Sequence, residues 1–374
     1  MATKFHEIET LEQLDKILSG KSVVTRCAFR NLDFEKAACI RTDCRFGNCI
    51  FLGCSIPKQM KESIDSDCII LPQIDHPFTV LPSELYNAST LYAGFDIDKP
   101  ETVSTCYDGI VYSHFLKRGK TTENIKEMFI RSLHDTSIRE AMNDLLDEYN
   151  ERKVVGIMGG HGMLRTEKAF RDVVLLSKKL TENGCLMVSG GGPGVMEATH
   201  VGAWFAGRTT AEVDDALQML SVAPDFKHKE WLSGAFRVMQ KYPKGRYRSL
   251  GVPTWLYGHE PATPFATHIA KFFENSIRED GILTIAKGGI IYSPGSAGTM
   301  QEIFQDATQN HYLTFGYSSP MVFLDKKYWT EKMPVYPFLS GLMQSGGYKN
   351  LLISITDDIS EAEETIMKFS NEKI

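Results

Sequence analysis

Short apolar runs alternate with amphipathic segments through the second half of the chain. Between the runs, apolar residues recur at helical spacing, most clearly over 166–183. Strands separated by helices predict an α/β fold with a doubly wound parallel sheet that carries helices on both faces. The predicted strands cover residues 154–158, 186–188, 251–255, 289–292, 321–324 and 351–355.

The first half of the chain has a different pattern. Residues 1 to about 120 predict an irregular, strand-rich segment interrupted by prolines, and residues 122–150 predict helix. A polar stretch then leads into the first strand of the second half. We therefore expect a smaller, mixed N-terminal accessory domain over 1–150 and a catalytic domain over 151–374.

A five-residue repeat marks the N-terminal segment. Cys39, Cys44, Cys49 and Cys54 follow one another at intervals of five, and Phe34 and Phe29 continue the phase backwards. The pattern resembles the pentapeptide repeat, which implies a strand ladder over about 27–56 with the repeat centres facing inward. Zinc is the alternative, but structural zinc cysteines come as close pairs. We expect buried thiols and no metal, because free cysteine behaves as a small hydrophobe.

The composition limits the classes of molecule that the protein is expected to bind. The net charge is −6, from 41 basic and 47 acidic residues without long runs of either sign, which argues against nucleic acid or an anionic membrane as partner. The first residues are too polar for a signal peptide, and no apolar stretch has the length of a membrane span. We expect a cytoplasmic protein.

Two glycine-rich turns carry the chemistry. Each follows an apolar run and opens an amphipathic helix, an arrangement that presents backbone N–H groups and a helix N-terminus to an anion such as phosphate. In the predicted sheet, both turns fall at the carboxyl ends of strands, where ligands bind. The turns are Gly190-Gly191-Gly192-Pro193-Gly194 and Pro294-Gly295-Ser296-Ala297-Gly298-Thr299.

Two common nucleotide-binding patterns are not met. After the first strand, the third glycine of G-x-G-x-x-G is replaced by Arg165, and no acidic residue ends the second strand to hold a ribose. The P-loop pattern G-x-x-x-x-G-K-[ST] is also missing from the sequence. Hydride transfer with NAD and ATP hydrolysis are therefore disfavoured.

The paired turns resemble the LOG family of nucleotide phosphoribohydrolases, which have a Rossmann-like fold. The first turn and Met196 approach the family motif G-G-G-x-x-G-x-M with a shorter spacing, and residues 294–302 match P-G-G-x-G-T-x-x-E except at Ser296. Arg278 lies near the place of the arginine that the family carries upstream. Bacterial nucleotide 5′-monophosphate nucleosidases, with an extra N-terminal domain, are the more similar branch.

The residues also support this chemistry directly. N-glycosidic cleavage passes through an oxocarbenium-like centre, so a carboxylate near C1′ stabilises the transition state or activates water. Glu302 is the candidate carboxylate, and Arg278 is expected to hold the phosphate or to orient Glu302. Glu197 is a candidate ribose contact or a helix-dipole partner, and His161 a candidate contact to base or phosphate. The remaining candidate phosphate or substrate contacts are Gly159, Gly160, Gly190, Gly191, Gly192, Gly194, Gly295, Ser296, Gly298 and Thr299.

We therefore predict an N-glycosyl hydrolase that splits a nucleoside 5′-monophosphate into free base and ribose 5-phosphate without metal or organic cofactor. The alternative is a nucleotide-binding sensor with weak or no catalysis. The family resemblance implies a homodimer or a higher homo-oligomer. The motifs leave the preferred base open.

Overall fold

The computed structural model describes residues 5–37 and 44–372. The chain divides into two compact units, one made of residues up to 84 together with 125–141, the other of residues 85–124 and 142–372. The chain thus passes between the units three times, whereas the sequence predicted a single boundary near residue 150. The long helix α4 (Ile125–Leu146) contributes to both units.

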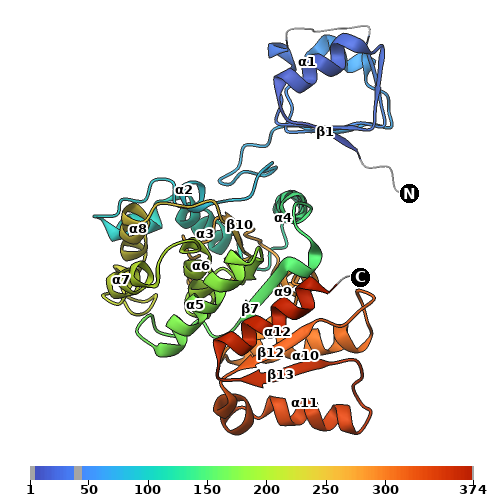
Figure 1. The fold of residues 1–374 in the computed structure, drawn as a ribbon. Helices are drawn as coiled ribbons and strands as arrows, with labels where there is room; N and C mark the ends of the chain where they lie inside the picture. The colour runs from blue at the N-terminus through green and yellow to red at the C-terminus, as the bar shows by residue number, and fades with distance from the viewer. Residues whose placement is uncertain (1–4, 38–43, 373–374) are drawn as a thin grey trace. The chain divides into compact units, whose positions relative to one another are not determined.

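The first unit is a coil of short parallel strands (Figure 1). One sheet has the order β1-β3-β5-β6, and β2 pairs with β4. Helix α1 (Leu11–Gly20) begins at a capping box formed by Thr10 and Gln13. The other elements are β1 (His6–Ile8), β2 (Val23–Thr25), β3 (Cys27–Arg30), β4 (Arg45–Gly47), β5 (Ile50–Leu52), β6 (Ile69–Leu71) and the 3-10 helices η1 (Phe34–Lys36) and η2 (Lys58–Ser63).

The predicted repeat centres lie inside this coil. Phe29, Phe34, Cys44, Cys49 and Cys54 are all buried, as predicted, while Cys39 lies outside the described residues. The thiols of the last two donate to backbone carbonyls, as with Cys54 Sγ to the oxygen of Phe29 at 3.4 Å. Parallel in-register stacking also aligns Phe29 with Phe51. The ladder is thus an aromatic and thiol core.

The second unit holds a seven-stranded parallel sheet in the order β10-β9-β8-β7-β11-β12-β13, which confirms the predicted α/β class (Figure 1). Apolar side chains on both faces bury the central strands under helices. The strands are β7 (Val154–Met158), β8 (Leu186–Ser189), β9 (Ser249–Gly251), β10 (His268–Ile269), β11 (Ile290–Tyr292), β12 (Pro320–Leu324) and β13 (Leu352–Thr356).

Helices cover the sheet, and α5 packs against both α6 and α12. The α-helices are α2 (Ala88–Leu91), α3 (Tyr107–Arg118), α5 (Lys168–Glu182), α6 (Val195–Trp204), α7 (Thr210–Leu220), α8 (Trp231–Lys241), α9 (Asn275–Ile285), α10 (Ala297–His311), α11 (Val335–Gln344) and α12 (Ile359–Asn371). The short helices are η3 (Pro100–Ser104), η4 (Glu151–Lys153), η5 (Trp255–Tyr257) and η6 (Tyr328–Lys332).

The strand order reverses between β7 and β11. From β7 the chain proceeds to β8 and β9 on one side, and from β11 to β12 and β13 on the other. Right-handed crossovers then place α5 and α10 on opposite faces, which opens a crevice at the carboxyl ends of these two strands. This crevice is where a ligand is expected in a doubly wound sheet.

Two sequence predictions were wrong in detail. The strand predicted over 251–255 is β9 at Ser249–Gly251, and residues 255–257 form η5 instead. The N-terminal segment was predicted to be strand-rich, yet it contains α1 and α3. Within the described residues, no helix is both long and apolar enough to cross a membrane.

Candidate functional site

Three turns meet at the switch point of the sheet. The amide of Gly160, after β7, donates to the carbonyl oxygen of Pro294, after β11, at 3.0 Å. The amide of Val195, at the start of α6, donates to the carbonyl oxygen of Gly160 at 3.2 Å. The two glycine turns predicted from sequence therefore belong to one site, joined by the turn that contains Gly159 and Gly160.

Glycine is required here because the segments approach too closely for a side chain. A Cβ on Gly159 would lie 2.8 Å from Cγ2 of Val195, and a Cβ on Gly191, whose φ is +69°, would lie 2.9 Å from Pro253. Gly194 also has a positive φ of +67° and abuts the backbone of Gly160 and His161. The glycines thus bring the three turns together.

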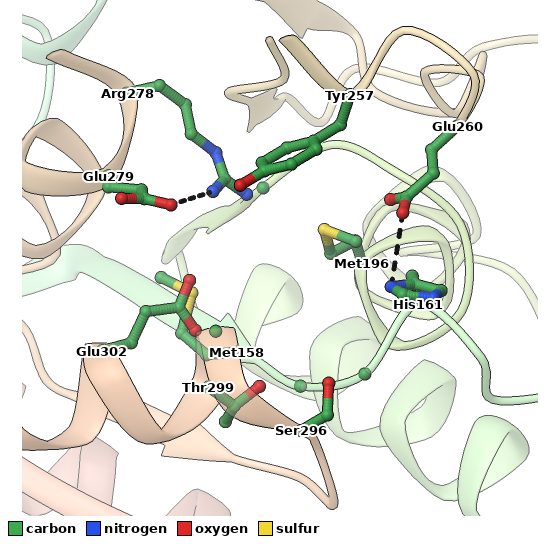
Figure 2. A pocket seen from close by; sticks show the side chains of 14 residues that line it. Met158, His161, Met196, Tyr257, Glu260, Arg278, Glu279, Ser296, Thr299 and Glu302 are labelled. Atoms are coloured by element: carbon green, nitrogen blue, oxygen red, sulfur yellow. Dashed lines mark ion pairs between the residues drawn. The ribbon is translucent and has the colours of Figure 1, made fainter. Parts of the chain in front are cut away.

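A cleft of about 220 Å³ opens above these turns (Figure 2). It is lined by nine of the predicted site residues: Gly159, Gly160, His161, Gly190, Arg278, Ser296, Gly298, Thr299 and Glu302. The predicted residues Gly191, Gly192, Gly194 and Gly295 do not line it and act in the turn geometry instead. The cleft is also lined by Met158, Met196, Tyr257, Glu260 and Glu279.

The acidity of Glu302 is altered by its surroundings in this cleft. Burial raises its pKa to about 7, the positive charge of Arg278 lowers it, and the negative charge of Glu279 raises it. Glu302 points into the cleft from the second turn of α10, toward the end where Arg278 and Glu279 lie (Figure 2). A carboxyl group with a pKa near neutrality is suited to proton transfer at physiological pH.

Arg278 is held in place by contacts with Val252, Glu279 and Gly190. Its Nε donates to the carbonyl oxygen of Val252 at 3.1 Å, and its Nη1 lies 3.8 Å from Glu279 Oε1. Its Nη2 lies against Gly190, so that a Cβ at position 190 would collide with it. The guanidinium group is thereby fixed between the first glycine turn and the carbonyl oxygen of Val252, and some of its N–H donors remain to bind an anion.

The N-terminus of α10 offers uncapped donors to the cleft. Ser296 is the N-cap residue, but its side chain makes no capping hydrogen bond with the described residues. Its hydroxyl group and that of Thr299 lie on the cleft side of the helix end (Figure 2). Gly295 leaves room for Thr299, whose side chain packs against it. A helix N-terminus of this kind favours negative charge.

A buried histidine supports the first glycine turn from below. His200 Nε2 and Ser189 Oγ are 2.9 Å apart, and His200 Nδ1 and Ser249 Oγ are also 2.9 Å apart. Ser189 Oγ accepts the amide of Gly191 at 3.1 Å. Burial lowers the pKa of His200 to about 3, so the ring is neutral and links α6, β8 and β9 without an unpaired charge.

Glu197 does not reach the cleft, which corrects the prediction of a ribose contact. Its carboxylate is completely buried and accepts from Arg165 at 2.9 Å (Nε) and 2.5 Å (Nη2). The Arg165 guanidinium also stacks on the ring of Trp231, 4.6 Å from its centroid. The arginine that interrupts G-x-G-x-x-G therefore forms an internal ion pair that fixes α6.

Sequence reasoning missed the side of the cleft formed by Tyr257 and Glu260. The Glu260 carboxylate lies 3.4 Å from His161 Nδ1, and both residues line the cleft opposite Glu302 (Figure 2). Tyr257 and Glu260 belong to the segment after β9, which has no glycine-rich motif. The only sequence signal is the isolated sequence Tyr-Gly-His-Glu at 257–260.

No family model matches the sequence, and no curated protein matches it. Among solved structures, the molybdenum cofactor binding protein of the phototrophic bacterium Rippkaea orientalis is similar with a TM-score of 0.35 and 13% identity, over 57% of this chain and 95% of that chain. The Chlamydomonas rheinhardtii Moco carrier protein is similar with a TM-score of 0.35 and 16% identity, over 59% of this chain and 98% of that chain. The function must therefore be argued from the site.

Proposed function

We propose that the protein hydrolyses the N-glycosidic bond of a nucleoside 5′-monophosphate and releases the free base and ribose 5-phosphate. The observation that carries the proposal is the convergence of Glu302 and Arg278 on one cleft above the glycine turns. The resemblance of both turns to the LOG family motifs supports the same reaction, and we propose that the chain is a relative of that family.

The 5′-phosphate would bind at the N-terminus of α10. Gly298 and Thr299, whose amides precede the first intrahelical bond, the hydroxyl groups of Ser296 and Thr299, and the guanidinium group of Arg278 all lie on this cleft. Together they provide the donors and the positive charge that a phosphate dianion requires. The cleft also contains Glu279 and Glu302, so phosphate binding depends on this concentrated set of donors and not on net charge.

Glu302 would carry the chemical step. As a carboxylate beside C1′ it would stabilise the oxocarbenium-like transition state and take a proton from the attacking water. The bond from C1′ to the base nitrogen breaks with its electron pair on the base, which then takes up a proton, and the water oxygen bonds to C1′. Arg278 would hold the phosphate, which fixes the ribose relative to Glu302.

The test is a panel of nucleoside 5′-monophosphates incubated with the protein, with released base and ribose 5-phosphate both quantified by chromatography. We expect turnover by the wild type. In Glu302→Gln the rate of base release should fall about a hundredfold or more, while the nucleotide affinity of this variant should stay within about tenfold of that of the wild type. The control variant is Glu331→Gln, an exposed glutamate outside the cleft. Binding without turnover by the wild type would overturn the proposal and leave a nucleotide-binding sensor.

The remaining expectations follow from the same resemblance. We propose a homodimer or a higher homo-oligomer that acts on the nucleotide pool of the cytoplasm. Sedimentation equilibrium measures the assembly directly, and a monomer at micromolar concentration would contradict it.

A further inference from the structure

The cleft has a part that the proposed reaction does not use. Tyr257 and Glu260 belong to one turn, in which the amide of Glu260 donates to the carbonyl oxygen of Tyr257 at 2.8 Å. Both side chains line the cleft: the Tyr257 ring extends toward Arg278, and Glu260 lies with His161 on the other side of Met196 (Figure 2). An aromatic ring and a carboxylate are thus presented together to whatever extends beyond the ribose.

This turn is firmly braced by the rest of the unit. The ring of Tyr112, on α3, packs against Gly258, where any Cβ would collide with it. Trp255, just before the turn, donates from Nε1 to Asp108 Oδ1 at 2.8 Å, and its amide donates to the carbonyl oxygen of Phe272 at 2.9 Å. The position of the Glu260 carboxylate is therefore set by packing.

The two oxygens of Glu260 have different surroundings. Oε1 lies 3.4 Å from His161 Nδ1 and 3.8 Å from His259 Nε2. Oε2 faces the glycine turn, 4.0 Å from where a Cβ of Gly192 would be. The side chain is only 17% exposed. Because Glu260 lines the cleft, its carboxylate presents acceptor oxygens to the donors of a bound ligand.

The hydrogen-bonding groups of the nucleobases decide which base can bind the Glu260 carboxylate. A carboxylate can only accept hydrogen bonds. Guanine presents two adjacent donors, N1–H and the 2-amino group, and can bind both oxygens of a carboxylate. Adenine and cytosine place a ring-nitrogen acceptor beside their amino group, and uracil flanks its single N–H with two carbonyl oxygens. Each of these bases would therefore bring one of its acceptor atoms against an acceptor oxygen of the carboxylate.

We infer that Glu260 is the base-reading residue of this cleft and selects guanine, with the Tyr257 ring as the surface on which the base stacks. The inference rests on the proposed function, because it places a nucleotide in the cleft with its phosphate at α10. His161 is a positioning residue that holds the Glu260 carboxylate. The substrate class is thereby narrowed to guanosine 5′-monophosphate.

The test compares kcat/KM for guanosine and adenosine 5′-monophosphate in the wild type and in Glu260→Gln. We expect the wild type to prefer the guanine nucleotide by at least about tenfold, the value of one good bidentate contact. Glutamine has one acceptor and one donor, which match the amino group and N1 of adenine. The variant is therefore expected to lower the ratio about tenfold or more and to raise the rate for adenosine 5′-monophosphate.

The control is Glu331→Gln, which introduces the same amide at an exposed glutamate outside the cleft, and it should keep the wild-type ratio. Calorimetric titration of both nucleotides into the protein gives the same comparison without turnover. Equal preference in the wild type, or an unchanged ratio in Glu260→Gln, would overturn the inference and leave the proposed function intact. An absence of turnover with guanine-selective binding would overturn only the proposed function.

Discussion

The guanidinium group of Arg278 occupies the space that a side chain at position 190 would need. Gly190 belongs to the first glycine turn and Arg278 to α9, and a Cβ on Gly190 would collide with Nη2 of Arg278 and lie 2.6 Å from Sδ of Met196. The glycine triplet thus has a role beyond offering amides. It leaves the space in which the arginine of the site is held.

Gly190→Ala is therefore expected to displace Arg278 and weaken phosphate binding. The end of the arginine side chain can move, so the fold should survive, while kcat/KM for nucleotide hydrolysis falls by at least about tenfold. Base release and thermal unfolding of the same preparation measure the two effects. Gly281→Ala, on the helix of Arg278 but in open space, is the matched control. Unchanged kcat/KM in Gly190→Ala would refute the proposal that the fit of Arg278 against Gly190 matters for the reaction.

The pH dependence of the reaction should report on Glu302. Burial raises its pKa to about 7, and the proposed mechanism needs its ionised form. The value of kcat/KM should therefore rise with pH through about 7 and level off above it. A profile that falls over this range would instead make Glu302 a proton donor. In Glu302→Gln the residual rate should lose this rise, and retention of it would assign the titration to another group.

The Arg165–Glu197 pair should matter for stability and not for substrate binding. Glu197→Gln leaves a buried guanidinium group without its counter-charge, so unfolding free energy should fall by about 3 kcal/mol or more. KM of the folded variant should stay within about twofold, since neither residue lines the cleft. Denaturant unfolding and steady-state kinetics measure the two quantities. Glu148→Gln, in the exposed pair with Arg248, should leave the free energy of unfolding almost unchanged. A raised KM without lost stability would restore the ribose contact.

The strand–helix alternation of the second half was readable because it depends on local hydrophobic periodicity. The strand at Val154–Met158 was placed correctly to the residue, as its five apolar or glycine positions are buried on both faces. Helices α1 and α3 were missed. In α3 the polar residues Asp108 and His114 break the apolar stripe, because Asp108 is buried against Trp255 and Lys271 from distant segments.

The site was predictable to the extent that it depends on glycine. Turns that bring backbone amides to the end of a strand need residues without a Cβ, so Gly190 and the turn around Gly295 were visible in the sequence. Glu197 shows where this reasoning fails. A glutamate early in a helix gives the same local signal whether it faces a ligand or a buried arginine, and Arg165 lies 32 positions away.

The sequence by itself determined the parallel α/β class, the two glycine turns and the early position of Glu302 on its helix, because each depends on short-range spacing. Arg278 became a candidate through the resemblance to the LOG family. Only the tertiary structure decided that both turns form one cleft, that Arg278 fits over Gly190, and that Tyr257 and Glu260 also line this cleft. These relationships join segments far apart in the chain. They follow from the reversal of strand order between β7 and β11, which short-range patterns do not encode.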